Sequence, residues 1–363
     1  MKLVVAGLTL SSSWGNGHAT TYRALLRAFA ARGHDVTFYE WDAPWYGGEH
    51  RDLPDPDFCR LELYPEWSRV RDRLLAEARE ADATLVGSYV HEGPRVIDDL
   101  AGAGVEPFFF YDIDTPVTVE QLRAGEEVSL RSDQVPLFTR YLSFTGGPFL
   151  HEVLESELGA REARQLACSV DADHYRPVAP ERELRSAVAY MGTYSEDRAE
   201  GIRQLLLDPA ARMPQARFLV AGPQYPDVDA WPSNVLHIPH VPPERHPAFY
   251  ASADWQLNLT RRAMREAGWA PSVRLFEAAA CGAPLLSDRW PGIDDLFEPG
   301  REILLPGSTD EVIEALRMHP DDRAAIGAAA RRVVLAGHTK ERRAEQLEHW
   351  LIEPATRPAP AGP

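Results

Sequence analysis

The sequence predicts an α/β protein made of two Rossmann-like domains, each built on a parallel sheet, that face a central cleft. Short apolar runs alternate with longer amphipathic segments along most of the chain, which is typical of βαβ units. A polar, proline-containing stretch at residues 168–184 interrupts this alternation and indicates a linker. The 363 residues are enough for two cores, because domains usually span about 100–200 residues.

The first series of alternating segments predicts a domain over residues 1–170. Gly33 and Gly104 follow helical patterns and are expected to end those helices, because glycine adopts the left-handed conformation at low cost. The expected strands and helices, in chain order, are 3–8, 21–33, 35–41, 69–80, 83–89, 95–104, 107–114 and 140–144.

The second series predicts a nucleotide-binding domain over residues 171–337. Its expected elements are 187–192, 198–207, 217–222, 234–239, 246–253, 254–260, 272–282, 283–288, 302–307 and 310–318. A last helix is expected at 338–353, packing near the first domain, and the Pro- and Ala-rich residues 354–363 are expected to be disordered. Ligands of open parallel sheets bind at the carboxyl ends of the strands, so we expect the site in the cleft.

Composition excludes several classes of function. The formal net charge of −17 and the pI near 5.2 oppose binding to nucleic acid or anionic lipid, which depends on clustered Lys and Arg. No stretch approaches the roughly 20 apolar residues of a membrane span. The three cysteines, Cys59, Cys168 and Cys281, lie far apart and lack zinc-site spacing. We therefore expect a cytoplasmic protein without a membrane span or a metal site.

The first candidate site is the segment Ser11–Tyr22, between the first strand and the first helix. Gly15 and Gly17 would let the backbone approach a ligand closely, and the helix start offers free N–H groups. His18 stands at this position and has a reference pKa suited to proton transfer. The alternatives are a purely structural glycine turn and a histidine that only packs or caps.

Two carboxylates follow the apolar strand at 107–114. Alternation predicts that Asp112 and Asp114 lie on the same side of the chain and face the cleft. They could bind an acceptor hydroxyl, act as a general base or hold Mg²⁺ or Mn²⁺, and the alternative is a simple Asp-Thr-Pro turn. His91 with Glu92, and the loop Gly146–Pro148, follow other strands and are secondary candidates.

The most specific pattern lies between Leu259 and Asp288. Ser272 is expected to cap a helix whose first N–H groups, at Val273 and Arg274, would bind a diphosphate with help from Arg274 or Arg261. One turn further on, Glu277 could accept two hydrogen bonds from a ribose. The alternative is an ordinary Ala-rich buried helix.

The chain resembles the CgeB-like, spore-maturation type glycosyltransferases of the GT-B fold. The matching text is SWGNGHATTYRALLRA, DIDTPVT, LSFTGGP, CSVD, MGTYS, FLVAGPQYP and PSVRLFEAAACG, which covers both halves of the chain. The resemblance implies that Glu277 holds the donor ribose and that the helix start before it holds the diphosphate. It also implies that the loops with Gly192, Thr193 and Tyr194, and with His240 and Val241, contact the phosphates and the base.

The sequence departs from this resemblance at one position. Many retaining GT-B enzymes have a second Glu, near the transferred sugar, where this chain has Trp269, and Glu266 is the nearest carboxylate. Retention is therefore open, and an inverting displacement with His18 or Asp114 as the base is the other possibility. We predict independence from metal, because fixed dipoles and Arg can stabilise a diphosphate leaving group.

Three other interpretations stay open at the level of sequence. A GT-A-type transferase would bind its metal through Asp112 and Asp114. A Rossmann dehydrogenase would use Glu40 for a ribose, and a binding protein would keep the nucleotide-sugar site without turnover. The acceptor could be a polysaccharide, a lipid, a protein or a natural product, and the aromatic segment Asp42–Leu53 could line its site.

Overall fold

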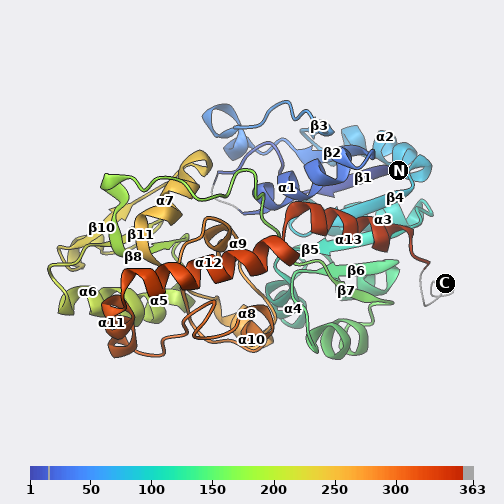
Figure 1. Cartoon of the computed structure of the whole chain (residues 1–363). Helices are drawn as coiled ribbons and strands as arrows, with labels where there is room; N and C mark the ends of the chain where they lie inside the picture. The colour runs from blue at the N-terminus through green and yellow to red at the C-terminus, as the bar shows by residue number, and fades with distance from the viewer. Residues whose placement is uncertain (15–16, 355–363) are drawn as a thin grey trace. The chain divides into compact units, whose positions relative to one another are not determined.

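The structure is a computed structural model that describes residues 1–14 and 17–354 (Figure 1). Gly15, a predicted ligand contact, and residues 355–363 of the predicted disordered tail lie outside the described residues. The chain divides into two compact units. The first unit comprises Met1–Cys168 and Lys340–Pro363, and the second unit comprises Ser169–Thr339. The predicted boundary after residue 170 falls in the same linker.

The first unit contains a parallel sheet of seven strands in the order β3-β2-β1-β4-β5-β6-β7. The topology switches between β1 and β4, because the chain moves from β1 outward to β3 and then returns to start β4 on the other side of β1. The strands are β1 (Lys2–Gly7), β2 (Asp35–Trp41), β3 (Arg60–Tyr64), β4 (Ala83–Gly87), β5 (Phe108–Asp112), β6 (Arg140–Ser143) and β7 (Ala163–Gln165).

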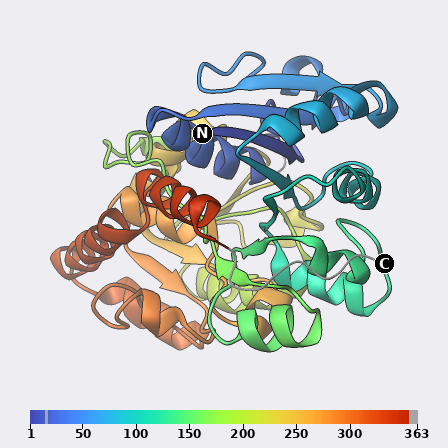
Figure 2. The same ribbon diagram turned by 90° about the vertical axis from the view of Figure 1, so that its right-hand side faces the viewer.

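Helices cover both faces of this sheet, so its central strands are apolar on both sides. Leu3 and Val5 of β1 pack in the cluster with α1 and α13, whereas Val4 and Ala6 face α2 and α3. Figure 2 gives a second view of these layers. The helices are α1 (His18–Ala31), α2 (Trp67–Glu80), α3 (Gly93–Gly102), α4 (Thr115–Arg123) and α13 (Lys340–Ile352), with short turns at Pro44–Tyr46, Gly48–His50 and Ser132–Leu137 and a π-helix at Leu150–Glu157.

The second unit contains a parallel sheet of five strands in the order β10-β9-β8-β11-β12. The topology switches between β8 and β11, which are neighbours in the sheet although β9 and β10 lie between them in the chain. The strands are β8 (Ser186–Met191), β9 (Phe218–Ala221), β10 (Val235–Ile238), β11 (Ala253–Asn258) and β12 (Leu285–Ser287).

The helices of the second unit also form two layers. Val188 and Trp255 face the core with α5, α6 and α11, and Gln256 on the opposite face donates to carbonyls of α7. α12 packs closely on α9, because a Cβ at Gly327 would lie 2.2 Å from the Gly282 carbonyl oxygen. The helices are α5 (Glu196–Ile202), α6 (Asp208–Arg212), α7 (His246–Ser252), α8 (Arg262–Ala267), α9 (Val273–Ala280), α10 (Ile293–Leu296), α11 (Thr309–Arg317) and α12 (Pro320–Gly337), with a π-helix at Arg203–Leu207 and short turns at Arg182–Leu184, Val228–Ala230 and Pro243–Arg245.

The last helix is fixed to the first unit by one buried arginine. Arg140 of β6 is fully buried and donates to the carbonyl oxygens of Trp350, Glu353 and Pro354 at the end of α13. Its Nε lies 3.0 Å from the carboxylate of Glu162. These contacts satisfy carbonyl groups that a helix end leaves unpaired. Among the helices that the structure describes, none is long and apolar enough to span a membrane.

Candidate functional site

The second unit places its best candidate site at the switch between β8 and β11. In open α/β sheets, ligands bind in the crevice beyond the carboxyl ends of the two strands at such a switch. Gly192 and Thr193 follow β8, and Leu259 and Thr260 follow β11. α9, which connects β11 with β12, begins at the same edge of the sheet. The residues predicted from the MGTYS loop and from the segment 259–288 therefore lie at the same edge of this sheet.

Arg274 ties the ends of β8 and β11 together. Its Nε donates to the carbonyl oxygen of Met191 at the end of β8, and its Nη1 donates to Asn258 Oδ1, 2.9 Å away, at the end of β11. The guanidinium lies over the ring of Tyr190, with 4.8 Å between Cζ and the ring centroid. Two of its nitrogens are therefore committed to the protein, while Nη2 has no hydrogen-bond partner among the described residues.

Gly192 is required by this arrangement. A Cβ at Gly192 would lie 2.8 Å from Arg274 Nη2 and 2.8 Å from the Tyr190 hydroxyl. Its carbonyl oxygen accepts a hydrogen bond of 2.8 Å from Tyr225. Gly222, with φ of +140°, brings the loop after β9 against the same peptide, since its Cβ would lie 2.1 Å from the Gly192 oxygen. The backbone of this loop therefore packs directly against Arg274 and Tyr190, which leaves no room for a side chain at position 192.

The predicted cap at Ser272 is corrected in part. Ser272 occupies the N-cap position of α9, but its hydroxyl donates to Asn258 Oδ1 at 2.8 Å and makes no side-chain cap. The first turn of a helix lacks intrahelical acceptors for its N–H groups. Without a side-chain cap, the N–H groups of Val273 and Arg274 stay available to an anion, as the sequence predicts.

Glu277 lies one turn further along α9, with 5% of its surface exposed. The hydroxyl of Tyr250 donates to Oε2 over 2.7 Å. No lysine or arginine among the described residues pairs with this carboxylate, and the hydroxyl of Tyr175 is a second donor beside it. Burial and the nearby Glu277 raise the pKa of Tyr250 well above its usual value, so Tyr250 stays a donor. A buried carboxylate whose donors are neutral hydroxyls suits a further neutral donor such as a sugar hydroxyl.

A second buried pair lies behind Glu277. The Tyr175 hydroxyl and His246 Nδ1 are 3.2 Å apart, and His246 Nε2 is 3.0 Å from the carbonyl oxygen of Val241. Burial lowers the pKa of His246, so its ring is neutral at pH 7. The side chain of Val241 is buried, so this predicted contact can reach a ligand only through its backbone, whereas His240 is exposed.

Arg261 differs from Arg274 in its surroundings. It is exposed, follows Thr260 at the N-cap of α8, and its guanidinium makes no hydrogen bond or ion pair among the described residues. Of the two predicted diphosphate ligands, Arg261 is the one whose charge is uncommitted. Thr193 lies in the loop after β8, and its carbonyl oxygen accepts a hydrogen bond of 2.6 Å from Arg198. The hydroxyl of Tyr194 in the same loop donates to Glu196.

A polar cavity of about 460 Å³ lies on the other side of the β11 loop, beside α5. Thr260, Arg265 and Asp288 line it. Burial raises the pKa of Asp288 to about 6, although Thr260 donates to it from both its backbone N–H and its hydroxyl. Trp269, at the position of the expected second Glu, has φ of +44° and donates to Asp295, while Glu266 is exposed and pairs with Arg262 at 3.5 Å.

In the first unit, the side chains of His18 and Asp114 lie close together. His18 is the first residue of α1, and its Nε2 lies 3.6 Å from Asp114 Oδ2. His18 has 7% of its surface exposed, and its ring meets that of Tyr89 edge to face. At Gly17 a Cβ would meet nothing within 4 Å, so protein packing does not require a glycine there.

The predicted orientation of Asp112 is wrong. Asp112 is fully buried and accepts hydrogen bonds from Tyr141, from Thr118 and from the N–H of Asp114. Burial raises its pKa to about 6, against the effect of these donors. Because β5 ends at Asp112 and Asp114 is the N-cap of α4, the chain turns between them and the alternation of an extended strand no longer applies. Asp112 therefore organises the start of α4 and cannot join Asp114 around an ion.

Glu40, considered above as a ribose ligand of a dehydrogenase, has a different role. It is fully buried, and both carboxylate oxygens accept hydrogen bonds from the loop after β1. The donors are the Thr9 hydroxyl, the Leu10 N–H and both the N–H and the hydroxyl of Ser11. The carboxylate is thus used within the protein, and the dehydrogenase interpretation loses its acidic residue.

The secondary candidates have separate roles. His91 stacks on Trp41 with centroids 3.8 Å apart, and Glu92 is the N-cap of α3 in a left-handed conformation. Gly146 lies against Gln165. No group of three or more His, Cys, Asp or Glu that could hold a metal occurs within residues 1–14 and 17–354.

Three residues of the second-unit site were not predicted. Asn258 joins Ser272 to Arg274, Tyr190 lies under the guanidinium, and Tyr250 holds Glu277. Each lies in a strand or helix whose pattern is explained by packing alone. The available signals were the polar Asn258 at the end of an apolar strand and the tyrosine in the helix before it.

Comparison with known proteins agrees with this anatomy. Residues 198–349 match the family described as "Glycosyl transferase-like". Searching curated proteins by sequence gave no significant match. Among solved structures, sucrose-phosphate synthase from Thermosynechococcus elongatus is similar at 15% identity and a TM-score of 0.64, covering 96% of this chain and 98% of that one.

Two further structures are similar over nearly their whole length. HepE from Anabaena, solved with UDP and glucose, has 13% identity and a TM-score of 0.68 over 97% of this chain and 99% of its own. An alpha-glucosyltransferase, solved with UDP-glucose and DNA containing an abasic site, has 11% identity and a TM-score of 0.72 over 97% and 100%. The chain therefore has the GT-B fold. Residues 198–349 thus form a glycosyl transferase-like segment within a GT-B fold that extends over nearly the whole chain.

Proposed function

We propose that this protein transfers a sugar from a nucleoside-diphosphate sugar to a hydroxyl acceptor without a metal ion. The observation that carries the proposal is Glu277, a buried carboxylate without a cationic partner among the described residues, behind the uncapped start of α9 at the β8–β11 switch. A nucleotide needs an acceptor for its ribose hydroxyls and donors for its phosphates. Both lie on α9, one helical turn apart.

In this proposal each part of the donor has its own group. Glu277 binds the ribose, and the N–H groups of Val273 and Arg274 bind the diphosphate. The uncommitted Arg261 adds positive charge, whereas the N–H groups of Gly192 and Tyr194 already donate to carbonyl groups of the protein. As the bond to the sugar breaks, negative charge grows on the diphosphate, and fixed donors at that position stabilise the transition state without an ion.

The first unit supplies the acceptor side. His18, oriented by Asp114, accepts the proton of the acceptor hydroxyl, and its other ring nitrogen, Nδ1, has no hydrogen-bond partner among the described residues. We assign the protein to the CgeB-like type on the motifs named above. A cytoplasmic location is part of the proposal, supported by Cys59, Cys168 and Cys281, none of which forms a disulfide.

UDP is the first base to test, because the similar HepE and alpha-glucosyltransferase structures hold UDP or UDP-glucose. The test is calorimetry with UDP, GDP, dTDP and NADH on the wild type, on Glu277→Ala and on Glu266→Ala as an exposed control on α8. We expect one nucleoside diphosphate to bind the wild type and the control, and to bind Glu277→Ala at least about tenfold more weakly. Binding of NADH alone would refute the proposal.

Turnover is tested separately. The wild type should slowly hydrolyse the matching nucleotide sugar, Glu277→Ala should not, and EDTA should leave the rate unchanged. Nucleotide binding without hydrolysis or transfer would instead identify a binding protein. Loss of activity in EDTA with recovery in Mn²⁺ would contradict the metal-independent mechanism.

A further inference from the structure

The first unit carries an aromatic surface that neither the fold nor the His18–Asp114 pair explains. Trp41 ends β2, and His91 follows β4, so the two residues belong to the strands on either side of β1. Their rings stack with centroids 3.8 Å apart and an interplanar angle of 12°. Trp45 meets Trp41 edge to face at 5.1 Å and has 52% of its surface exposed. The rings therefore join the strands that flank β1, at the switch point of this unit.

The loop that carries His91 is held in an unfavourable conformation. Tyr89 has φ of +62° and Glu92 has φ of +53°, which Cβ atoms disfavour. Ser129 fixes this loop in two ways. Its Oγ accepts a hydrogen bond of 3.0 Å from the N–H of Tyr89, and its carbonyl oxygen would lie only 2.4 Å from a Cβ at Gly93. Left-handed non-glycine residues that the surroundings enforce are concentrated at ligand sites.

The same loop reaches the proton acceptor. Tyr89 contacts His18 edge to face, with 5.5 Å between ring centroids. His18 is more than nine-tenths buried, and its Nδ1 is buried without a hydrogen-bond partner in the described structure. The loop Tyr89–Glu92 therefore connects an unsatisfied catalytic candidate to an exposed aromatic cluster.

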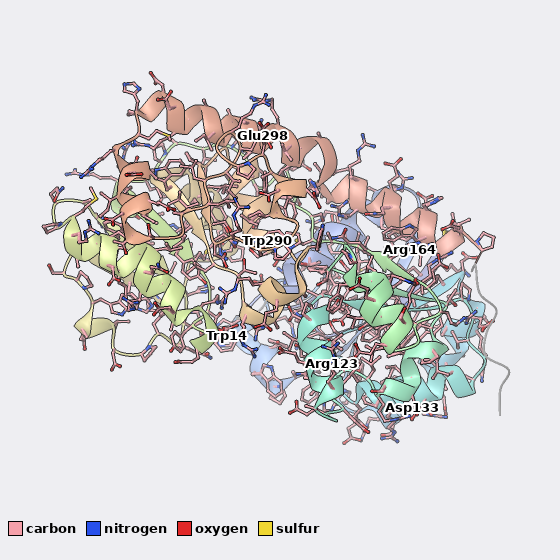
Figure 3. The ribbon with its side chains drawn as sticks, turned by 90° about the horizontal axis from the view of Figure 1, so that it is seen from below. Trp14, Arg123, Asp133, Arg164, Trp290 and Glu298 are labelled. Carbon is pink, nitrogen blue, oxygen red and sulfur yellow. The ribbon has the colours of Figure 1, made fainter. Side chains whose placement is uncertain are left out.

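A second indole–imidazole stack lies in the loops that follow β1 and β2. Trp14, labelled in Figure 3, has 46% of its surface exposed and stacks on His50 at 4.4 Å. Its loop is bonded to the segment after β2 through Ser12, which donates to the His50 carbonyl over 2.5 Å, and through Ser13, which donates to Asp52. Half-exposed indoles on fixed loops are surfaces ready to stack on a ligand.

We propose that Trp41, Trp45, Tyr89 and His91 form an acceptor platform, and that its ligand is an uncharged carbohydrate whose C–H face stacks on the rings. This inference rests on the proposed function and names the class of its acceptor. The platform is open, so the hydroxyls on the other face of a sugar ring would keep their water. Polar side chains at its edge, including Glu92 with 35% of its side chain exposed, can accept hydrogen bonds from hydroxyls.

An uncharged ligand fits the electrostatics. The chain has a net charge of −17, and Glu92 is already paired with Arg95 at 2.8 Å, so no uncommitted lysine or arginine of the described residues adjoins the rings to attract an anion. A flat phenol would gain most from an enclosed apolar slot, whereas the ring of Trp45 stands half in solvent. The stacked, open geometry favours a sugar, whose faces are apolar and whose rim is polar.

The first test is saturation-transfer NMR on the wild-type protein with neutral mono- and disaccharides and, in parallel, with simple phenols. We expect saturation transfer to the ring C–H protons of at least one saccharide, and its loss in Trp45→Ala. Trp45→Phe should retain part of the signal, and Val128→Ala, at another exposed apolar residue of the same unit, should retain all of it. Binding of phenols alone would overturn the proposal in favour of an aromatic acceptor.

The second test measures transfer to the saccharide that binds. Trp45→Ala should raise the KM for this acceptor about tenfold and leave kcat and the KM for the donor within about twofold, because a stacking ring binds the acceptor without touching the reacting atoms. An unchanged acceptor KM, or an equal loss for donor and acceptor, would overturn it. Because the NMR test needs no donor, a failure of nucleotide binding would refute only the proposed function.

Discussion

At the scale of single residues, the clearest consequence concerns Tyr250, which holds one oxygen of Glu277 through a 2.7 Å hydrogen bond. We predict that Tyr250→Phe weakens binding of the nucleoside diphosphate about tenfold, because the freed carboxylate loses its orientation toward the ribose. The specific readout is the affinity ratio between the nucleotide and its 2′,3′-dideoxy analogue. This ratio should fall in Tyr250→Phe.

The matched control is Tyr22→Phe in the first unit, which also removes a buried hydroxyl. It should leave the affinity and the ratio unchanged. If Tyr250→Phe lowers affinity for both nucleotides equally, Tyr250 supports the fold of the second unit but does not position Glu277.

A second residue-scale prediction concerns pH. Burial raises the pKa of Asp112 from 3.8 to about 6 in the folded state. Between pH 4 and 6 the folded protein then holds a proton that the unfolded chain has released, so stability falls as pH rises through this window, by about 3 kcal/mol for a shift of this size. We predict that Asp112→Asn removes about half of the measured fall, because Asp288 has a similarly raised pKa, and the melting temperature at several pH values is the readout.

Burial also raises the pKa of Asp288 to about 6. Because of Asp288, the stability of Asp112→Asn should still fall as pH rises, but by less than that of the wild type. The control Asp57→Asn replaces an exposed carboxyl, with 88% of its side chain accessible, and should retain the wild-type profile. A wild-type profile in Asp112→Asn would show that Asp112 is ionised in the folded protein throughout this range.

Sequence patterns identified side chains more reliably than their directions. Glu277 and Arg274 were found because charges inside an apolar helix are unusual. Asp112 and Glu40 were assigned to ligands, yet both bind the protein itself, because the donors around them come from segments distant in the chain. Nothing in the local sequence shows that Tyr141 or Ser11 will meet these carboxylates.

At the scale of elements, the structure assigns a specific role to Arg140, which caps the end of α13 from β6. We predict that Arg140→Met destabilises the first unit by about 3–5 kcal/mol, because it uncaps the helix and leaves Glu162 buried with a weaker partner. Hydrogen exchange should accelerate in α13, and the melting temperature should fall.

Arg69→Met is the control, because the Arg69 side chain is 73% exposed and its ion pair with Glu66, at 3.8 Å, should contribute little. Faster exchange spread evenly over the first unit, without a preference for α13, would contradict the role of Arg140 as a cap of that helix.

Elements with strong apolar patterns were predicted well, and those with weak patterns were not. The central strands β1, β4, β5, β8 and β11 all fall on predicted apolar runs. The short edge strands β3 and β7 were missed, because edge positions tolerate polar residues such as Arg60 and Gln165. α12 was missed because alanines and Gly327 form its packing face, so contact depends on closeness to α9 rather than on large apolar side chains.

At the scale of the whole molecule, the GT-B fold was predicted from two alternating series and a linker, and the similar structures confirm it. Strand order was beyond the sequence, since it depends on which strands pair after each crossover. The switch points of both sheets followed only from the observed order β2-β1-β4 and β9-β8-β11. Those switches explain why residues from separate motifs share one edge.

The whole-molecule charge leads to the last prediction. The similar alpha-glucosyltransferase was solved with DNA, whereas this chain carries a net charge of −17. DNA binding depends on releasing counterions through clustered Lys and Arg, and the two lysines here, Lys2 and Lys340, lie far apart in the sequence. We predict no shift of duplex or abasic DNA in gel-retardation assays even at low salt, and no sugar transfer to it, under conditions in which a neutral saccharide accepts sugar.

Reversing three exposed acidic residues of the first unit to lysine should not create transfer to DNA, because the acceptor platform is built for an uncharged ring. Salt-sensitive DNA binding by the wild type would contradict both the charge argument and the choice of a neutral acceptor.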